Sequence, residues 1–247
     1  MVEDIFKSDE AYYADREYLS NSALKLLRES PTKFHLWRTG KWRQPDTAAF
    51  DMGKAVHSIV LEGIDNAVVC EVRKDQRTKA YQKLLLENKG KLLLSQSEYR
   101  DYLGMSERLQ NNSEVQALML GGRSEVPQTG TYNGLKFKGK ADMLVEKWDD
   151  DYIVDLKTTA KSIDEFKKSA KYLLYNQQAA LYSHLFEVER FVFVVVEKSW
   201  PYEIGIFECS QEFMDSGYQE LNRSIKLYED LFVDGHYTSN YARRFTL

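Results

Sequence analysis

The segment 138–157 constrains the fold of this chain more than any other stretch. Two runs of alternating apolar and polar residues flank a polar, Asp-rich break, and this is the pattern of a β-hairpin. A turn centred between Trp148 and Asp149 places Asp142 directly opposite Asp155 on the neighbouring strand. Because side chains alternate along a strand, we expect the other face of the hairpin to pack on the core. That face consists of Ala141, Met143, Val145, Val154 and Leu156.

Two facing carboxylates are unusual in a hairpin. Their Cβ atoms lie only about 5 Å apart, and like charges at that distance destabilise the pair. A hard divalent cation with oxygen ligands would turn this cost into a gain. Lys157, on the same face and expected opposite Lys140, would then orient a water or neutralise charge on a phosphate. The alternatives are a hairpin whose charges merely face water, or a one-residue slip that separates the two Asp residues.

Size and composition indicate an ordinary globular protein. The chain has 247 residues, 43% of them hydrophobic and 29% charged, and no apolar run approaches the roughly 18 residues that span a bilayer. Cys70 and Cys209 stand far apart, which argues against a disulfide framework and against a Cys-based metal site. The N-terminal residues lack the order of a signal peptide, so we expect a cytoplasmic protein with no membrane contact. A net charge of −4 argues against nonspecific coating of nucleic acid.

The pattern of elements predicts a single α/β domain over residues 1–247, with a central mixed β-sheet flanked by helices. Its expected parts are an arm without clear periodicity (1–17), a mainly helical region (18–120), the sheet core (121–210), and a C-terminal helix and tail (211–247). Predicted helices cover 20–29, 31–39, 46–63, 78–88, 97–110, 113–120, a segment opened by a Ser162/Glu165 capping box, 172–187 and 210–233. Predicted strands cover 67–73, 123–132, 135–147, 152–157, 191–196 and 202–208, with Asn133-Gly134 as a hairpin turn.

Two residues outside the hairpin are candidate metal ligands. His57 follows Gly53 by one helical turn, and a glycine there would let a ligand or another backbone come close. A single His on a helix is more often packed or exposed than a ligand, so both interpretations stay open. Glu125 lies on the strand predicted to precede that of Asp142, and it either approaches Asp142 across the sheet or points to solvent.

One helix places Tyr175, Gln178 and Tyr182 on a single stripe. These side chains either contribute to a site or pack against the sheet as aromatics with a buried amide. The sequence leaves both interpretations open.

Basic residues gather locally despite the negative net charge. From residue 16 to 43 there are seven basic and two acidic residues, and a second basic cluster follows the hairpin. Such runs either track a nucleic-acid backbone or form solvated helix faces. The candidate DNA contacts are Lys25, Arg28, Lys33, Arg38, Lys161 and Tyr175. The chain has no glycine-rich phosphate loop, so the sequence does not support nucleotide hydrolysis.

Five motifs in order resemble a known family. Gly139-Lys-Ala-Asp142, Asp155-Leu-Lys157 and Gln178-Ala-Ala-Leu-Tyr182 resemble the PD-(D/E)XK nuclease superfamily, with the last motif as in its RecB-like branch. Gly53-Lys-Ala-Val-His57 and Tyr18-Leu-Ser-Asn-Ser22 are similar to the RecE-type phage and prophage exonucleases. The resemblance covers roughly residues 18 to 185, and the family's Pro before the first Asp is replaced by Ala141.

The resemblance implies roles for individual residues. The implied metal ligands are Asp142, Asp155, His57 and Glu125. Lys157 would be the catalytic lysine, and Gln178 and Tyr182 would brace the site or hold the DNA strand.

The function implied is Mg²⁺-dependent hydrolysis of DNA from duplex ends, with Mn²⁺ as a substitute metal. Relatives of this type form rings around DNA, digest the 5′ strand and work with a strand-annealing protein in phage-type recombination or repair. We therefore expect a homo-oligomeric ring, double-stranded DNA ends as substrate and an annealing partner. The alternatives are an endonuclease or helicase-associated nuclease of the same fold, and a catalytically idle DNA-binding subunit.

Overall fold

The computed structural model describes residues 6, 8–43, 48–72, 74–75, 77–148, 150–233 and 236–237. Parts of four predicted segments lie outside these residues: most of 1–7, the helix start at 46–47, the strand end at 73 and the tail at 238–247.

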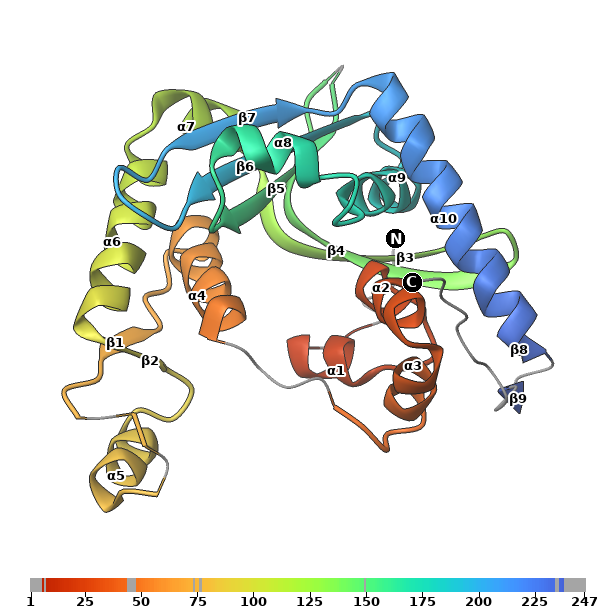
Figure 1. Cartoon of the computed structure of the whole chain (residues 1–247). Coiled ribbons are helices and arrows are strands. Elements are labelled where there is room, and N and C mark those ends of the chain that lie inside the picture. The colour runs from red at the N-terminus through yellow and green to blue at the C-terminus, as the bar shows by residue number, and fades with distance from the viewer. Residues whose placement is uncertain are drawn as a thin grey trace, which may run out of the picture.

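A five-stranded mixed sheet forms the centre of the molecule, which confirms the predicted fold class (Figure 1). Its strands are β3 (Arg123–Tyr132), β4 (Leu135–Val145), β5 (Tyr152–Thr159), β6 (Arg190–Glu197) and β7 (Ile204–Glu208), in that spatial order. Strands β5 and β6 are parallel, and the other neighbouring pairs are antiparallel. A parallel pair needs a crossover connection, which α8 (Ile163–Ser169) and α9 (Tyr175–Phe186) supply.

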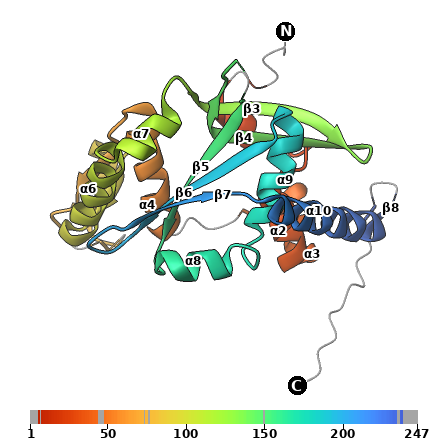
Figure 2. The ribbon, with the colours of Figure 1, turned by 90° about the horizontal axis from the view of Figure 1, so that it is seen from above.

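Helices cover the sheet from two ends (Figure 2). One group consists of α4 (Ala48–His57), α6 (Gln96–Gln110) and α7 (Ser113–Met119). The other consists of α2 (Asn21–Glu29), α3 (Pro31–Arg38), α9 and α10 (Gln211–Leu231). The predicted N-caps are confirmed at Ser20, Ser30 and Ser162, whose side chains each accept a backbone N–H at a helix start. Helix α6 begins earlier than predicted because Ser95 forms a capping box with Glu98.

The predicted hairpin register is confirmed between β4 and β5. Met143 pairs with Val154, Leu144 with Ile153 and Val145 with Tyr152, as a turn after Trp148 requires. The ladder between β4 and β5 begins at Met143, one residue after Asp142. There the Leu156 N–H donates to Asp142 Oδ2 at 2.8 Å instead of to a backbone carbonyl. Asp142 and Asp155 therefore stand at the point where the two strands part, and not as a regular cross-strand pair.

Both faces of the hairpin are buried, which differs from the expectation of one core face. Met143, Val145, Val154 and Leu156 pack in a cluster with α4 and α6, as predicted. Leu144 and Ile153, expected on the polar face, are buried in a second cluster, and Ala141 belongs to this cluster too. The reason is the crossover, because α8 and α9 cover the face that the sequence suggests is open to solvent.

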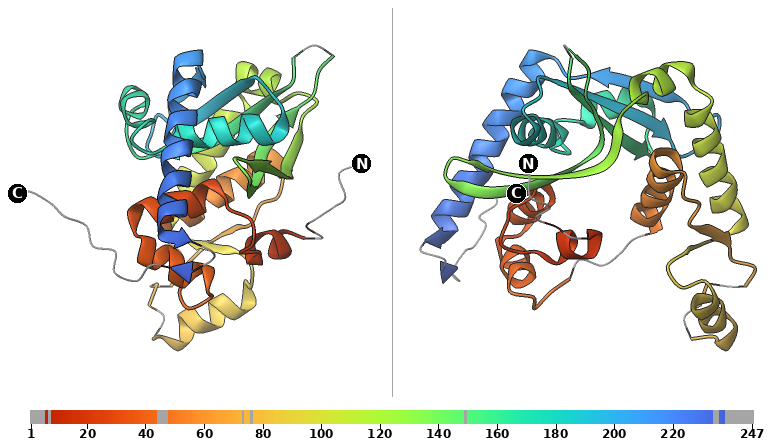
Figure 3. Two further views of the ribbon diagram at one scale, coloured as in Figure 1. Left: turned by 90° about the vertical axis from the view of Figure 1, so that its right-hand side faces the viewer. Right: turned by 180° about the vertical axis from the view of Figure 1, so that it is seen from behind.

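Part of the segment 1–17, predicted to be a loose arm, forms a helix. Residues Asp9–Ala14 form a helix, α1, which is capped by Ser8 and lies below the β3–β4 ribbon in the right-hand view of Figure 3. Buried Lys138 holds its C-terminal end, with Nζ 2.6 Å from the Tyr12 carbonyl and 3.0 Å from the Asp15 carbonyl. Lysines on β4, more than a hundred residues away in sequence, thus order a segment that has no periodicity of its own.

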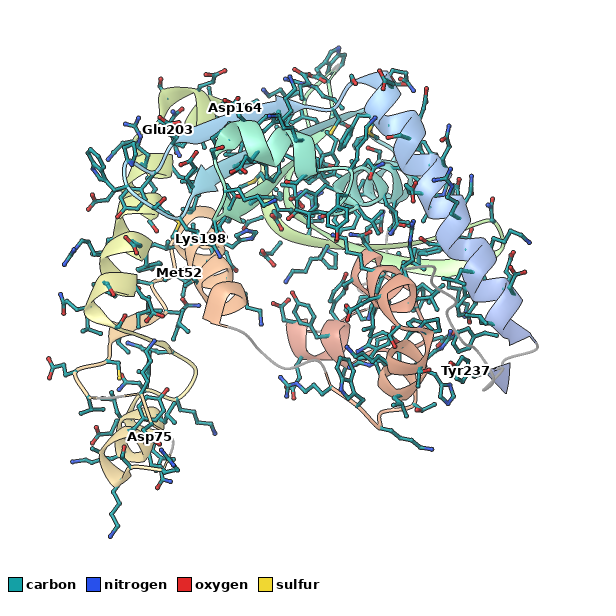
Figure 4. The ribbon with its side chains drawn as sticks, viewed as in Figure 1. Met52, Asp75, Asp164, Lys198, Glu203 and Tyr237 are labelled. Carbon is teal, nitrogen blue, oxygen red and sulfur yellow. The ribbon has the colours of Figure 1, made fainter. Side chains whose placement is uncertain are left out.

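The peripheral elements are short. Strand β1 (Ala67–Val69) is shorter than predicted and pairs in parallel with β2 (Leu92–Leu94), a strand that the sequence does not predict. Helix α5 (Lys79–Glu87) extends away from the sheet, near the labelled Asp75 (Figure 4). After α10, β8 (Phe232–Val233) pairs with β9 (His236–Tyr237), and the Tyr237 ring stacks on His35 of α3 at 4.6 Å. Among the described helices, none combines the length and apolar character needed to cross a membrane.

Candidate active site

The site lies where β3, β4 and β5 meet the end of α4 and the start of α9. His57 is the last α-helical residue of α4, and a π-helical turn, Ser58–Glu62, continues the chain to Gly63. Glu125 comes from β3, and Asp142 comes from β4, one residue before its pairing with β5 begins.

Three of the predicted ligands come together. Ligand atoms of His57, Glu125 and Asp142 all lie within 4.8 Å of one another, and His57 Nδ1 is 3.4 Å from Asp142 Oδ2. All three side chains are partly exposed, so the group is open to solvent. One imidazole and two carboxylates suit a divalent cation that accepts nitrogen and oxygen ligands. The residues present therefore fit a divalent metal, and Glu125 approaches Asp142 across the sheet instead of pointing away.

Asp155 lies outside this group, although the resemblance implies that it is a ligand. Its side chain is 1% exposed, its Oδ2 accepts a hydrogen bond from Gln178 Nε2 at 2.5 Å, and its Oδ1 forms an ion pair with Lys157 Nζ. Lys157 follows by two residues on the same strand face, which brings the ammonium group against the carboxylate. In this structure Asp155 holds the predicted catalytic lysine, and Gln178 braces Asp155; their catalytic roles remain predictions.

The charges of the site influence one another. Burial, followed by the neighbouring Asp155, raises the pKa of Asp142 well above its usual range. Burial and nearby Lys157 lower the pKa of His57 to about 4, so the imidazole is neutral near pH 7 and has a free lone pair for a metal. Burial alone would lower the pKa of Lys157, but Asp155 and Asp142 raise it, and the ammonium stays charged.

A second lysine stands beside Lys157. The Tyr175 ring lies 5.3 Å from Lys157 Nζ and 4.7 Å from Lys25 Nζ, so both cations contact one aromatic ring. Burial and the charge of Lys157 lower the pKa of Lys25 to about 8. Tyr175 also stacks on Phe166, with ring centroids 5.5 Å apart. Two of the predicted DNA contacts, Lys25 and Tyr175, therefore lie at the candidate site.

The other predicted DNA contacts lie elsewhere. Arg28 forms an ion pair with Glu220 of α10, and Arg38 lies over the Tyr228 ring at 5.2 Å. Lys33 of α3 pairs with Glu29, the last residue of α2, at 3.1 Å. Lys161 is exposed after β5. Arg28 and Arg38 thus pack α2 and α3 against α10.

Tyr182 lies against the part of strand β4 that carries the first motif. A Cβ at Gly139 would stand 3.0 Å from the Tyr182 ring, so glycine permits the close approach of α9 to β4. Burial raises the pKa of Tyr182 well above its usual range, whereas the Lys140 N–H lowers it. Tyr182 thus braces the strand that carries Asp142, which agrees with one of its two predicted roles.

Sequence reasoning missed two residues near the group. Lys140 contacts Glu125 and also Asp9 of α1, at 2.9 Å and 3.0 Å from the two carboxylate oxygens. The available signal was the alternation of Lys136, Lys138 and Lys140 on one face of a strand that leads to Asp142. No local pattern indicated Asp9 as a partner of Lys140, because the two residues are far apart in the sequence.

Comparison with solved structures supports the fold. A protein from Eubacterium rectale named "Putative exonuclease" superposes with a TM-score of 0.65 at 18% sequence identity, over 90% of this chain and 85% of that one. A phage related exonuclease from Haemophilus somnus 129PT matches with a TM-score of 0.35 at 13% identity, over 71% of this chain and 93% of that one. A search of curated protein sequences gave no significant match.

A family model assigns the chain directly. The model described as "PDDEXK-like domain of unknown function (DUF3799)" matches residues 20–237, which is most of the chain. This match confirms the resemblance to the PD-(D/E)XK superfamily and supports a nuclease. The chain therefore belongs to this PDDEXK-like family, and the group of His57, Glu125 and Asp142 beside Lys157 is its candidate active site.

Proposed function

We propose that this protein is a divalent-metal-dependent deoxyribonuclease that hydrolyses phosphodiester bonds from the ends of duplex DNA. The observation that carries the proposal is that ligand atoms of two carboxylates and one imidazole lie within 4.8 Å of one another, near the half-buried Lys157, which is ion-paired with Asp155. The name of the Eubacterium rectale protein agrees with exonuclease activity. The family assignment is the second support.

His57, Glu125 and Asp142 would hold the metal, which we propose to be Mg²⁺, with Mn²⁺ able to replace it. When bound, such an ion supplies a Lewis acid for a phosphoryl oxygen and a water of lowered pKa. The neutral state of His57 matters here, because a protonated imidazole cannot bind a cation.

Lys157 would position the attacking water and neutralise the charge that develops on the phosphate. Its ammonium group is held by Asp155 on one side and by the Tyr175 ring on the other, which leaves few orientations open. A fixed ammonium group can donate hydrogen bonds to a non-bridging phosphate oxygen and to the attacking water as charge develops. Gln178 fixes Asp155, so we expect a chain of contacts from α9 to the reacting phosphate.

Lys25 would hold the neighbouring phosphate. It contacts the same Tyr175 ring as Lys157 and comes from α2, outside the sheet. Such contacts grip the backbone without reading sequence and weaken as salt rises. Cleavage from the 5′ strand, assembly into a ring and cooperation with a strand-annealing protein in recombination or repair complete the proposal, on the strength of the resemblance alone.

The test compares linear with covalently closed duplex DNA, in Mg²⁺ and in chelator, for the native chain and for Lys157→Ala. We expect loss of the linear substrate only, dependence on the metal, and no digestion by the variant. A matched control is Lys226→Ala, because Lys226 is an exposed lysine of α10 paired with Asp230 and far from the site. Substrates labelled at either end report the polarity.

Other outcomes would replace the proposal. Cutting of the closed circle would identify an endonuclease, and DNA binding without cleavage of either substrate would identify an idle nuclease fold. Full activity in chelator would refute the role of the metal. Light scattering of the native protein reports whether a ring forms.

A further inference from the structure

Lys140 connects the candidate metal group to the N-terminal helix. Its Nζ contacts Glu125 Oε2 and lies 3.0 Å and 2.9 Å from the two carboxylate oxygens of Asp9. The Lys140 side chain is 8% exposed, and the Tyr13 ring of α1 lies 5.3 Å from its ammonium group. One buried cation thus bridges a predicted metal ligand and a residue of α1.

Glu125 needs such a partner because its backbone is strained. Its φ is +54°, in the left-handed region that a residue with a Cβ rarely adopts inside a strand. The neighbouring pairs Ser124–Met143 and Val126–Ala141 keep the β3–β4 register, but Glu125 itself is absent from the ladder. Strained backbone persists only where surrounding contacts fix it. The contact with Lys140 fixes the carboxylate end of this residue.

A carboxylate has two oxygens, so Glu125 can contact Lys140 with one oxygen and a metal ion with the other. Lys140 occupies Oε2 of Glu125, which leaves the other oxygen for a cation shared with His57 and Asp142. Carboxylates that bind metals are commonly oriented by a second hydrogen-bonding partner. A charged donor forms a shorter and stronger hydrogen bond than a neutral one, so it orients the ligand firmly.

Asp9 completes the arrangement. An ammonium group so near the site would repel a divalent cation, and the Asp9 carboxylate offsets that charge. Asp9 is 73% exposed, yet α1 keeps it in place, because Lys138 binds the Tyr12 and Asp15 carbonyls and Lys136 pairs with Glu17.

We propose that Lys140 and Asp9 are positioning residues that hold Glu125 in the geometry that a divalent metal requires. Through Asp9, α1 then contributes to the active site. This inference rests on the proposed metal-dependent function and assigns to it two residues that belong neither to the metal group nor to the DNA contacts named above. It predicts that changes at α1 alter metal affinity, although α1 supplies no ligand.

The experiment is calorimetric titration of the DNA-free protein with Mn²⁺, so that binding is measured without activity. We expect Glu125→Gln to weaken binding, and Lys140→Met to weaken it by about 10- to 100-fold, the usual effect of losing a partner of a metal ligand. Asp9→Asn should weaken it in the same direction by a smaller factor. Lys140→Arg should restore most of the affinity. Lys140→Met combined with Glu125→Gln should bind no more weakly than Glu125→Gln alone, because both act through one ligand.

Lys136→Met is the matched control. Lys136 lies on the same face of β4, pairs with an acidic residue of the N-terminal segment as Lys140 does, and has no contact with Glu125 in the structure. We expect it to leave Mn²⁺ affinity unchanged. Thermal unfolding of each variant establishes that it is folded; Asp9→Asn, at an exposed position, keeps the test open if Lys140→Met does not fold.

The outcomes separate the two proposals. If the native protein does not bind Mn²⁺, or if Glu125→Gln binds it normally, the proposed metal site is wrong. If Glu125→Gln weakens binding but Lys140→Met and Asp9→Asn do not, only the present inference is wrong. Tighter binding by Lys140→Met would also overturn it, because Lys140 would then compete with the metal instead of positioning its ligand.

Discussion

Replacing Gln178 by Ala is expected to impair catalysis beyond its effect on stability. Gln178 and Gln177 are adjacent buried amides on α9, but their partners differ. Gln178 donates to Asp155 at 2.5 Å, whereas Gln177 donates to Asn21 at 2.8 Å and accepts from Ser224 at 2.6 Å. Gln177→Ala is therefore a matched control that removes buried hydrogen bonds without touching the residue that holds Lys157.

The expected magnitude follows from the partner. Asp155 is 1% exposed, so water cannot easily replace the lost donor. Hydrogen bonds to charged groups contribute about 1.5–3 kcal/mol, so Gln178→Ala should lower the free energy of unfolding by about 2 kcal/mol. For a chain of this size that corresponds to a fall in Tm of about 4–8 °C. If the same energy keeps Lys157 in place in the transition state, kcat should fall by about 30-fold.

The assay combines thermal unfolding with steady-state digestion of linear duplex DNA. Gln177→Ala loses two neutral hydrogen bonds at about 1 kcal/mol each, so both variants should lose similar stability. Only Gln178→Ala should lose kcat, with KM nearly unchanged. Equal loss of kcat in the two variants would show that α9 acts through stability alone, and full activity of a folded Gln178→Ala protein would refute the role of this contact.

Three further predictions concern other parts of the molecule. A Cβ on Gly217 would overlap the Asn176 carbonyl where α10 crosses α9, so Gly217→Ala should lower the free energy of unfolding by about 1–3 kcal/mol, as denaturant titration would measure. Lys25→Ala should raise KM for DNA and reduce its salt dependence, whereas Lys33→Ala, at a residue paired with Glu29, should change both less; equal effects would contradict the placement of Lys25 at the site. Burial would raise the pKa of Asp15, but hydrogen bonds from the Tyr18 N–H and Lys138 lower it, so its contribution to stability is present above its ordinary value of 3.8 and is lost as pH falls through the lowered pKa. Asp15→Asn should accordingly destabilise the protein at pH 7 and have a vanishing effect in strong acid, and a loss independent of pH would refute this reasoning.

Local rules predicted most of the elements. The hairpin register between β4 and β5 follows from alternation and turn position, and the helix starts at Ser20, Ser30 and Ser162 follow from their capping side chains. The order of motifs was enough to indicate the family that the family model matches at residues 20–237. These features depend on residues close together in the chain.

The sequence did not predict α1 and β2, which depend on contacts between segments that are distant in the chain. Residues Asp9–Ala14 show no helical period of their own; α1 is capped by Ser8 and is held from β4 by Lys138 and Lys140. Strand β2 is three residues long and exists as a strand only through its pairing with β1. Sequence spacing could not reveal either.

The sequence by itself determined that Asp142 and Asp155 would come close, because strand alternation and the turn fix the register. Only the tertiary structure decided their different surroundings. The strands part beyond Met143, so Asp142 accepts the Leu156 N–H and meets His57 and Glu125, which arrive from α4 and β3. Asp155 remains buried between Lys157 and Gln178 of α9. Which partner each carboxylate receives depends on how helices pack on a sheet, and that packing is not encoded in any local period.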